Sequence, residues 1–160
     1  MRARDPHRFE ALFDAEFRRC AQTAARIVGD VDAAEELASE AFARAWSRWD
    51  RLDGGRSPGG WVMRVTINLA IDRVRRRRPD AEVVAASTDP GEGVADRLAL
   101  AAALRSLPRR QRDVVILRCL DDRSERDVAE ALGVSVGAVK THFHRGLARL
   151  REELGEEVVI

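Results

Sequence analysis

Residues 124–154, SERDVAEALGVSVGAVKTHFHRGLARLREEL, decide the fold, because they predict two helices around a tight turn. Ser124 can cap the first helix, and Asp127 in its first turn complements the helix dipole. Gly133 provides the left-handed backbone that favours a helix C-terminus, and Ser135 can cap the second helix. That second helix places apolar residues inward at helical spacing: Val139, Phe143, Leu147, Leu150 and Leu154. The pattern is that of a helix-turn-helix.

The opposite face of the second helix is polar. It carries side chains that can hydrogen-bond to bases or phosphates: Lys140, Thr141, His144 and Arg145. A helix fits the major groove of DNA, and its N-terminal half normally contacts the bases. On these residues alone an ordinary helical hairpin is the alternative, and the rest of the chain favours the DNA-reading helix.

Composition favours an all-α protein of one domain or two small ones. The chain has 160 residues, of which 45% are apolar and 34% charged, and it contains no Tyr. This balance suffices for a folded core with a hydrated surface. Pro and Gly are sparse inside the periodic segments, which indicates helices rather than strands.

Charge is unevenly distributed although the net charge is only +1. Residues 1–78 carry 16 basic and 12 acidic groups, residues 79–100 carry 1 and 5, and residues 101–160 carry 11 and 10. An acidic connector therefore separates two neutral-to-basic segments. Without strong overall attraction to phosphate, we expect the isolated chain to bind DNA weakly and to need a partner.

Neither metal nor cofactor chemistry is indicated. The two cysteines, Cys20 and Cys119, lie on apolar helix faces, which predicts buried free thiols rather than a disulfide or a metal site. The sequence shows no phosphate-binding loop, metal-ligand spacing or nucleophile triad, so an enzyme has little support. Because no apolar run approaches about 18 residues and the N-terminus is charged, we expect a cytoplasmic protein without membrane insertion.

The first half of the chain predicts three helices. Asp5 and Pro6 supply a cap and a first-turn proline for the first helix, which ends at Gly29. The second helix is expected over about residues 32–49. A glycine-rich loop, RLDGGRSPGG at residues 51–60, leads to a third helix that Ser57 can open and whose firm part begins near Trp61.

The third helix is mostly apolar and ends in a basic run, with five arginines among residues 73–78. Solvation of the helix end is one interpretation of the run, and a phosphate-contacting patch is the one we favour. Trp61 could stack on a base, although a place in the core is favoured.

Residues 5–78 and 94–154 are therefore predicted as two small helical domains, with residues 79–93 as a flexible linker. The linker, PDAEVVAASTDPGEG, has no helical period and contains two prolines and two glycines. The second domain is expected to hold four helices: one at about residues 94–104, one that Ser106 caps and Pro108 begins, and the helix-turn-helix pair.

Together these segments resemble the sigma-70 family of RNA polymerase initiation factors, of the short extracytoplasmic-function type. Three blocks match in the family's order over roughly residues 9–154. They are DAAEELASEAFARAW (residues 32–46), PGGWVMRVTINLAIDRVRRRR (residues 58–78) and LPRRQRDVVILRCLDDRSERDVAEALGVSVGAVKTHFHRGLARL (residues 107–150).

The resemblance implies a dissociable subunit that binds core RNA polymerase and promoter DNA. The first block is expected to dock on a coiled coil of the beta-prime subunit, with contacts to the beta subunit elsewhere. The candidate core-binding residues are Glu35, Glu36, Leu37, Glu40 and Arg44. A solvated helix face is the alternative for the carboxylates.

The second block is expected to melt and read the minus-ten element by capturing a flipped base, with the glycine-rich loop forming a pocket. The candidate residues there are Arg64, Asn68, Arg73, Arg75 and Arg76. In the third block, resemblance assigns the minus-thirty-five element to Lys140, Thr141, His144 and Arg145. An anti-sigma factor covering both DNA-binding domains is a further partner that resemblance implies.

Geometry supports a bipartite reader. The two promoter elements lie about 25 base pairs apart, or roughly 85 Å. Two domains each about 30 Å across, with a linker of at most about 50 Å, can cover that span. The linker could occupy a nucleic-acid channel of the polymerase or act as a passive tether. A stand-alone helix-turn-helix repressor explains residues 124–154 but leaves the first two blocks without a role.

Overall fold

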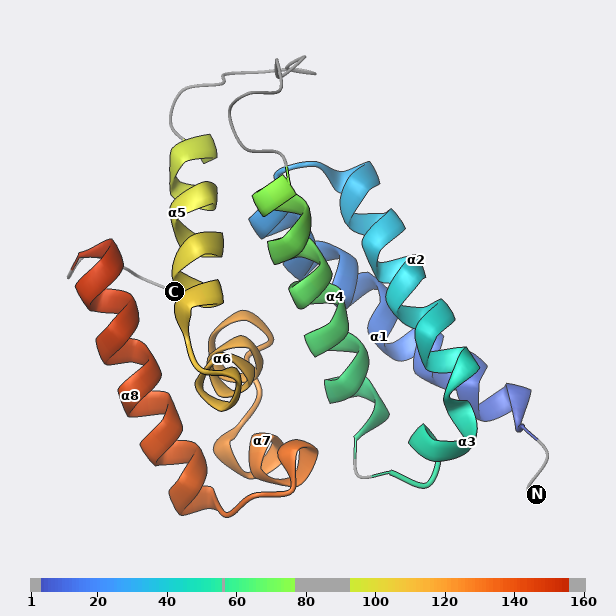
Figure 1. The fold of residues 1–160 in the computed structure, drawn as a ribbon. Helices are drawn as coiled ribbons and strands as arrows, with labels where there is room; N and C mark the ends of the chain where they lie inside the picture. Colours follow the sequence, from blue (N-terminus) through green and yellow to red (C-terminus); the bar gives the residue numbers. More distant parts are fainter. Residues whose placement is uncertain (1–3, 56, 77–92, 156–160) are drawn as a thin grey trace.

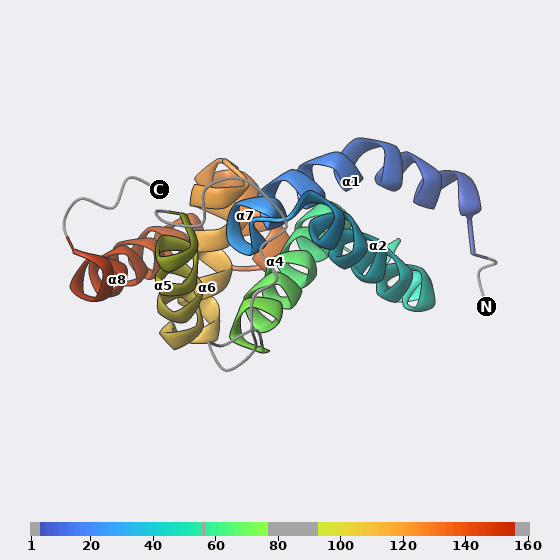
Figure 2. The same cartoon turned by 90° about the horizontal axis from the view of Figure 1, so that it is seen from above.

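The computed structural model describes residues 4–55, 57–76 and 93–155, and within these ranges every regular element is a helix (Figure 1). The helices form two groups that lie side by side (Figure 2). We call α1–α4 the N-terminal lobe and α5–α8 the C-terminal lobe. The all-α fold class predicted from the sequence is confirmed.

The N-terminal lobe is built on three long helices that pack on one another: α1 (Pro6–Val28), α2 (Val31–Ser47) and α4 (Pro58–Arg76). Its core is formed mostly by alanine and aliphatic side chains, with Ile27, Met63 and Ile67 fully buried. Small residues on α2 let the helices approach closely, so the lobe needs few large side chains to fill its interior.

Side-chain caps fix the starts of the first two helices, and the predicted cap and end of the first helix are confirmed. The Asp5 carboxylate accepts the His7 N–H at 3.0 Å and caps α1, which is followed by Gly29 in the left-handed region at φ 70°. Asp30 then caps α2 by accepting the Ala33 N–H at 3.1 Å. A side-chain acceptor satisfies amide groups that have no intrahelical partner, so each cap fixes where its helix starts.

The predicted extent of the second helix was wrong at its end. Helix α2 stops at Ser47, and a separate short helix, α3 (Trp49–Leu52), follows. Trp49 is only 2% exposed and donates its indole N–H to the Asp5 carbonyl at 3.2 Å. Its ring meets Phe9 edge-on, with centroids 5.2 Å apart, so aromatic packing against α1 turns the chain here.

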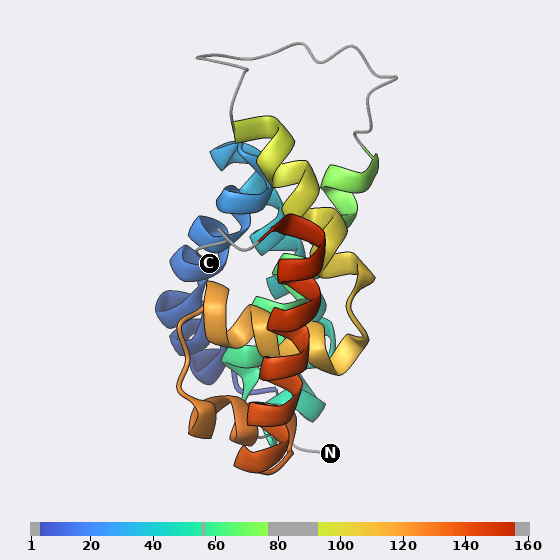
Figure 3. The same cartoon turned by 90° about the vertical axis from the view of Figure 1, so that its left-hand side faces the viewer.

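The C-terminal lobe contains α5 (Gly93–Ser106), α6 (Arg109–Val115), α7 (Glu125–Leu132) and α8 (Val136–Leu154). Helix α6 continues directly into a turn of π-helix, η1 (Ile116–Leu120), which the sequence did not predict. Figure 3 shows α8 along the outer side of the lobe.

Two boundary predictions need correction here. Gly93, expected as the last linker residue, is the first residue of α5, while residues 79–92 lie outside the described residues. Ser106 does not cap α6: it is the last residue of α5, and its hydroxyl donates to the Ala103 carbonyl at 2.8 Å. Pro108 occupies the cap position of α6 and forms no side-chain hydrogen bond, as expected for a residue without a polar side chain.

The two lobes are in contact with each other. The sequence predicted two domains joined by a linker and did not predict whether they would touch. Helix α4 packs against α1 and α2 on its own side and against α5, η1 and α7 of the C-terminal lobe. The buried side chains of both lobes belong to one continuous hydrophobic cluster. Helix α4 can serve both because its buried residues form a broad face along most of its length.

Candidate nucleic-acid interface

Helix α8 presents the polar face that the sequence predicted. The four side chains proposed for base and phosphate contact are all exposed: Lys140, Thr141, His144 and Arg145. On the opposite face Val139 and Leu150 are 0% and 1% exposed. The helix is therefore anchored along one side and accessible along the other, as a groove-reading helix must be.

The preceding turn fixes the orientation of α8. Ser124 accepts the Asp127 N–H at 3.1 Å and donates its hydroxyl to the Asp127 carboxylate at 2.7 Å, which lowers the pKa of that carboxyl group. Gly133 then adopts φ 66° at the end of α7, and Ser135 caps α8 by accepting the Ala138 N–H at 3.0 Å. The caps and the left-handed glycine expected from the sequence are confirmed.

Two of the α8 candidates have contacts within the chain. Lys140 Nζ lies 3.8 Å from Glu125 Oε2, and Thr141 donates its hydroxyl to the Gly137 carbonyl at 3.1 Å. An exposed ion pair of this length contributes at most about 1 kcal/mol, so a phosphate can replace the carboxylate. Thr141 keeps its oxygen lone pairs for accepting a hydrogen bond.

The candidates on α4 are less accessible. Arg64 is half-buried: its Nη1 lies 3.3 Å from Asp113 Oδ2 of α6, and its Nε donates to the Gly60 carbonyl at 3.4 Å. Asn68, one turn further along, is also half-buried. In this arrangement Arg64 therefore already has an anionic partner within the chain.

The basic end of α4 faces solvent. Arg75 and Arg76 are exposed, and Arg73 Nη2 lies 3.9 Å from Glu36 Oε2 of α2. The last two arginines of the run, Arg77 and Arg78, lie outside the described residues. The negative end of the helix dipole favours arginines at this C-terminus, and their clustered positive charge can attract a phosphate.

A hollow lies at the entry to the glycine-rich loop from which the sequence predicted a pocket, although only Arg51 of its lining residues belongs to that loop. It is lined by Ser47, Arg48, Asp50 and Arg51, at the junction of α2 and α3. The Arg48 guanidinium lies over the Trp61 ring, 6.0 Å from its centroid, and Trp61 is half-buried rather than fully in the core. A cation beside a partly exposed indole offers both phosphate attraction and a stacking surface.

The outer face of α2 is exposed and mostly acidic. Glu35, Glu36 and Glu40 are exposed, and Glu40 pairs with Arg44 one turn later. Leu37, a candidate for binding core polymerase, is instead 5% exposed and lies in the hydrophobic core. Its position follows from helical spacing, since Leu37 shares the buried face of α2 with Ala34 and Ala41.

The chain is similar to known proteins over both lobes. Residues 12–79 match the family model for sigma-70 region 2, and residues 97–150 match the model for sigma-70 region 4. The chain is 32% identical to the ECF RNA polymerase sigma factor SigW of Bacillus subtilis, over 94% of this chain and 90% of that protein. It is 39% identical to the RNA polymerase sigma-E factor of Streptomyces avermitilis, over 83% of this chain and 77% of that protein.

The chain belongs to the extracytoplasmic-function group of the sigma-70 family. Two solved structures share its fold. One is the sigma factor RpoE of Bartonella quintana in complex with the anti-sigma factor NepR, with a TM-score of 0.55, 22% identity, and coverage of 94% of this chain and 98% of that chain. The other is CnrH in complex with the cytosolic domain of CnrY, with a TM-score of 0.55, 22% identity, and coverage of 96% and 92%.

The family match places the candidate residues of this sigma-70 member in two regions. The α2 face and the α4 arginines lie within the region 2 match, and the exposed face of α8 lies within the region 4 match. The structure brings Arg64 and Asn68 together on α4, while the four α8 residues form a separate surface on the other lobe.

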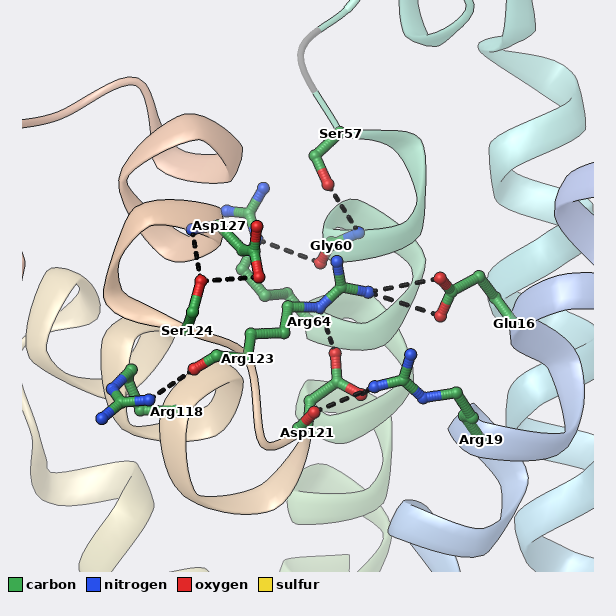
Figure 4. Close-up of polar contacts among 10 residues, drawn as sticks. All are labelled: Glu16, Arg19, Ser57, Gly60, Arg64, Arg118, Asp121, Arg123, Ser124 and Asp127. Atoms are coloured by element: carbon green, nitrogen blue, oxygen red, sulfur yellow. Dashed lines mark hydrogen bonds and ion pairs between the residues drawn. The ribbon is translucent and has the colours of Figure 1, made fainter.

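The contact between the lobes contains charged residues that the sequence did not single out. Arg123 lies between Glu16 of α1, with Nη2 3.3 Å from Oε2, and Asp121, which also accepts from Arg19 of α1 at 2.8 Å (Figure 4). Asp113 and Asp121 each stand beside an apolar run of the sequence, which was the available signal for a buried carboxylate. We call Glu16, Arg19, Asp121 and Arg123 the interlobe ion cluster.

The remaining titratable groups in the described parts of the chain form no further site. Among the described residues, no cluster of His, Cys, Asp and Glu side chains could hold a metal ion. Cys20 and Cys119 are both free thiols, the first fully buried and the second half-buried. None of the described helices is long and apolar enough to cross a membrane.

Proposed function

We propose that this chain is a dissociable, non-catalytic sigma subunit that binds core RNA polymerase and directs promoter-specific initiation. The observation that carries the proposal is the exposed polar face of α8 within a region 4 match, joined in one chain to a region 2 match. A helix-turn-helix alone is compatible with many regulators, whereas the two regions in this order are those of a sigma factor.

Readout of the minus-thirty-five element is assigned to α8. Its N-terminal half enters the major groove, where Arg145 and Lys140 meet guanine edges or phosphates. Thr141 and His144 provide shorter hydrogen-bonding groups beside them. The apolar side of α8 stays on α6, so the helix docks as part of a rigid lobe.

Melting and capture of the minus-ten element are assigned to α4 and the hollow beside it. Asn68 can hydrogen-bond to a base edge, while Arg64 and the exposed arginines at the end of α4 hold phosphates. Extruding a base costs a few kcal/mol of stacking, which contacts to the flipped base must offset. The Trp61 ring, once the Arg48 side chain over it moves aside, is our candidate for supplying them.

Binding to the polymerase is assigned to the acidic face of α2, through Glu35, Glu36, Glu40 and Arg44. Leu37 supports this face from beneath instead of contacting the partner. The RpoE structure was solved in complex with the anti-sigma factor NepR, and we extend to this chain the proposal that such a protein holds it inactive.

Run-off transcription tests the function. Core polymerase from the same organism, with this chain, is expected to give discrete transcripts from fragmented genomic DNA, and sequencing of their ends identifies the promoters. Arg145→Ala should reduce initiation at these promoters about tenfold, as loss of one good base contact predicts. Arg149→Ala, at another exposed position of α8, is the matched control and should change initiation less than twofold.

Two results would overturn the proposal. One is an absence of discrete transcripts when a different sigma factor supports initiation with the same core preparation. The other is tight, specific binding of the chain alone to duplex DNA as a homodimer on palindromic half-sites, which would indicate a stand-alone repressor.

A further inference from the structure

The contact between the lobes contains the four charged side chains of the interlobe ion cluster. The Asp121 side chain is only 1% exposed, and its carboxylate accepts a hydrogen bond from Arg19 of α1 at 2.8 Å. The backbone carbonyl of Asp121 accepts a second hydrogen bond from the same guanidinium group at 3.0 Å. Arg123, beside it, bonds to the Asp121 carboxylate and reaches Glu16 of α1 at 3.3 Å. Two residues of each lobe therefore satisfy one another's charges (Figure 4).

The backbone of α4 passes close to this cluster. A Cβ atom added at Gly59 would lie 2.8 Å from Glu16 Oε1 and 3.3 Å from Arg123 Nη2. One added at Gly60 would lie 3.1 Å from the Ala131 Cβ of α7. The Glu16 and Arg123 side-chain ends could move away from a side chain at Gly59, whereas at Gly60 the backbone of α4 comes close to α7 of the other lobe. The closed arrangement therefore includes close packing between the lobes.

The energetics of such a cluster depend on closure. A buried carboxylate loses its hydration and needs an ionic partner in the same place, which for Asp121 comes partly from the other lobe. When the lobes separate, water can solvate these groups again. The buried apolar side chains of the two lobes are continuous around this cluster, so separation also exposes apolar surface. The ion cluster is the part of the contact that charge reversal can weaken without changing those apolar side chains.

The closed arrangement does not fit the two promoter elements at once. The start of α4 touches α7, the helix that precedes α8, whereas the two elements lie roughly 85 Å apart on duplex DNA. Arg64, which the proposed function assigns to a phosphate, is held by Asp113 of the other lobe. DNA binding by both lobes therefore requires that they separate.

We infer that the interlobe ion cluster is an autoinhibitory contact: it keeps the free chain closed, and the chain must open before it can engage a promoter with the polymerase. The inference rests on the proposed function for its consequence but concerns a property of the free chain. Only the open fraction is competent, so the apparent affinity is reduced by that fraction. Weakening the cluster should therefore lower the concentration of chain needed for initiation.

The test reverses the charges that α1 contributes. Glu16→Lys with Arg19→Glu opposes like charges to Arg123 and Asp121 while the net charge stays unchanged. The matched control is Asp14→Lys with Arg18→Glu, which makes the same two reversals at exposed positions of the same helix. Arg19→Glu alone is a milder variant, since the Arg19 side chain is 49% exposed.

Lobe separation is measured on the free chain by pulsed electron–electron spin resonance. Spin labels are attached at Gln22→Cys on α1 and Ala148→Cys on α8, both exposed positions, in a Cys119→Ser background. Cys20 is 0% exposed and stays unlabelled. We expect one narrow distance distribution for the parent and the control, and a broad distribution at longer distances for the double reversal, with an unchanged far-ultraviolet circular dichroism spectrum.

Run-off transcription with limiting core polymerase measures the consequence. The half-saturating concentration of the double reversal should fall about fivefold below that of the parent, with the control unchanged and the same plateau for all three. A broad distribution of spin-label distances in the parent would show that the free chain is not closed. A narrow distribution in both reversal variants would show that the ion cluster does not hold the lobes together. If a reversal variant shows long spin-label distances but the half-saturating concentration of the parent, the ion cluster does not inhibit initiation. Absence of transcripts from every variant would refute the proposed function and leave the distance result valid.

Discussion

Arg64 of α4 and Asp113 of α6 form an ion pair across the two lobes, with Nη1 3.3 Å from Oδ2 and side chains that are 18% and 4% exposed. The arginine is one that the sequence assigned to DNA, and its partner is a nearly buried carboxylate of the same chain. Guanidinium groups bind carboxylates and phosphates through the same fork of N–H donors. Under the proposed function, Asp113 and a DNA phosphate would therefore compete for the same guanidinium.

Replacing this carboxylate tests how much the pair contributes to the closed fold. Asp113→Asn keeps the shape but removes the charge opposite Arg64, so the free energy of unfolding should fall by about 2 kcal/mol. Urea denaturation followed by circular dichroism measures the change. The matched control is Asp122→Asn, at an exposed residue with φ 51°. Asn tolerates this left-handed backbone, so the control should stay within about 0.5 kcal/mol of the parent. Equal effects of both substitutions would contradict a special role for Asp113.

Charge reversal on α2 tests the proposed polymerase-binding face. Glu35→Lys with Glu36→Lys should raise the apparent Kd for core polymerase about tenfold, because charge complementarity across an interface is lost. The variant should fold normally, since both residues are exposed. The control reverses Glu10 and Asp14, two exposed carboxylates of α1. Fluorescence anisotropy of the labelled chain titrated with core enzyme separates the cases, and similar loss in both variants would indicate a nonspecific effect of charge.

Local chemistry made both ends of α1 and the helix-turn-helix predictable. Ser124, Gly133 and Ser135 carry out the roles expected from their residue types, because caps and left-handed turns depend on neighbours within a few positions. The polar face of α8 was predictable for the same reason: helical spacing alone separates it from the buried face.

Long-range contacts were beyond the sequence pattern. The end of α2 is set by Trp49 packing on α1, and the ion cluster joins Arg19 to Asp121, which are 102 positions apart. No periodicity relates such residues. Leu37 illustrates a different limit. Its place in the block that resembles the family suggested a contact with core polymerase, whereas its helical spacing already predicted a buried position.

Thiol reactivity should distinguish the two cysteines. Burial raises the pKa of Cys20 to about 12, against the opposing hydrogen bond of Thr66, so almost no thiolate exists near neutral pH. Burial also raises the pKa of Cys119. This thiol is only half-buried, however, so a reagent in solution can reach it. At pH 8, iodoacetamide should modify Cys119 first and Cys20 only in urea, as mass spectrometry of tryptic peptides can show. Modification of Cys20 in the native chain at a comparable rate would contradict its burial.

The same pKa shift has a consequence for stability. Because the folded state favours the neutral Cys20 thiol, its contribution is complete below the ordinary pKa of 9.0 and is lost as pH rises from there towards about 12. Cys20→Ala removes this titration. Its free energy of unfolding should be lower than that of the parent at pH 7 but should decline less steeply between pH 9 and 11. Parallel declines in urea titrations would show that Cys20 does not contribute to the alkaline loss.

Two glycines of α8 should respond to alanine in opposite directions. Gly146 is buried, and an added Cβ would lie 2.8 Å from Val115 Cγ2 and 3.5 Å from Gln111 Cβ, both on α6. Because Val115 is itself 0% exposed and stiff at χ1, α8 would have to move away from α6. Overpacking costs about 1–3 kcal/mol, against a gain of at most about 1 kcal/mol in helix propensity, so Gly146→Ala should destabilise the fold by about 1 kcal/mol.

Gly137 provides the control within the same helix. A Cβ there would meet only Ser135 Oγ at 3.8 Å, so Gly137→Ala adds helix propensity without a clash. Its free energy of unfolding should rise by about 0.5 kcal/mol, measured by the same urea titration. If Gly146→Ala also stabilises the protein, α8 does not need its close approach to α6. The orientation of the face that carries Arg145 would then have to be fixed elsewhere, by α7 and the Gly133 turn.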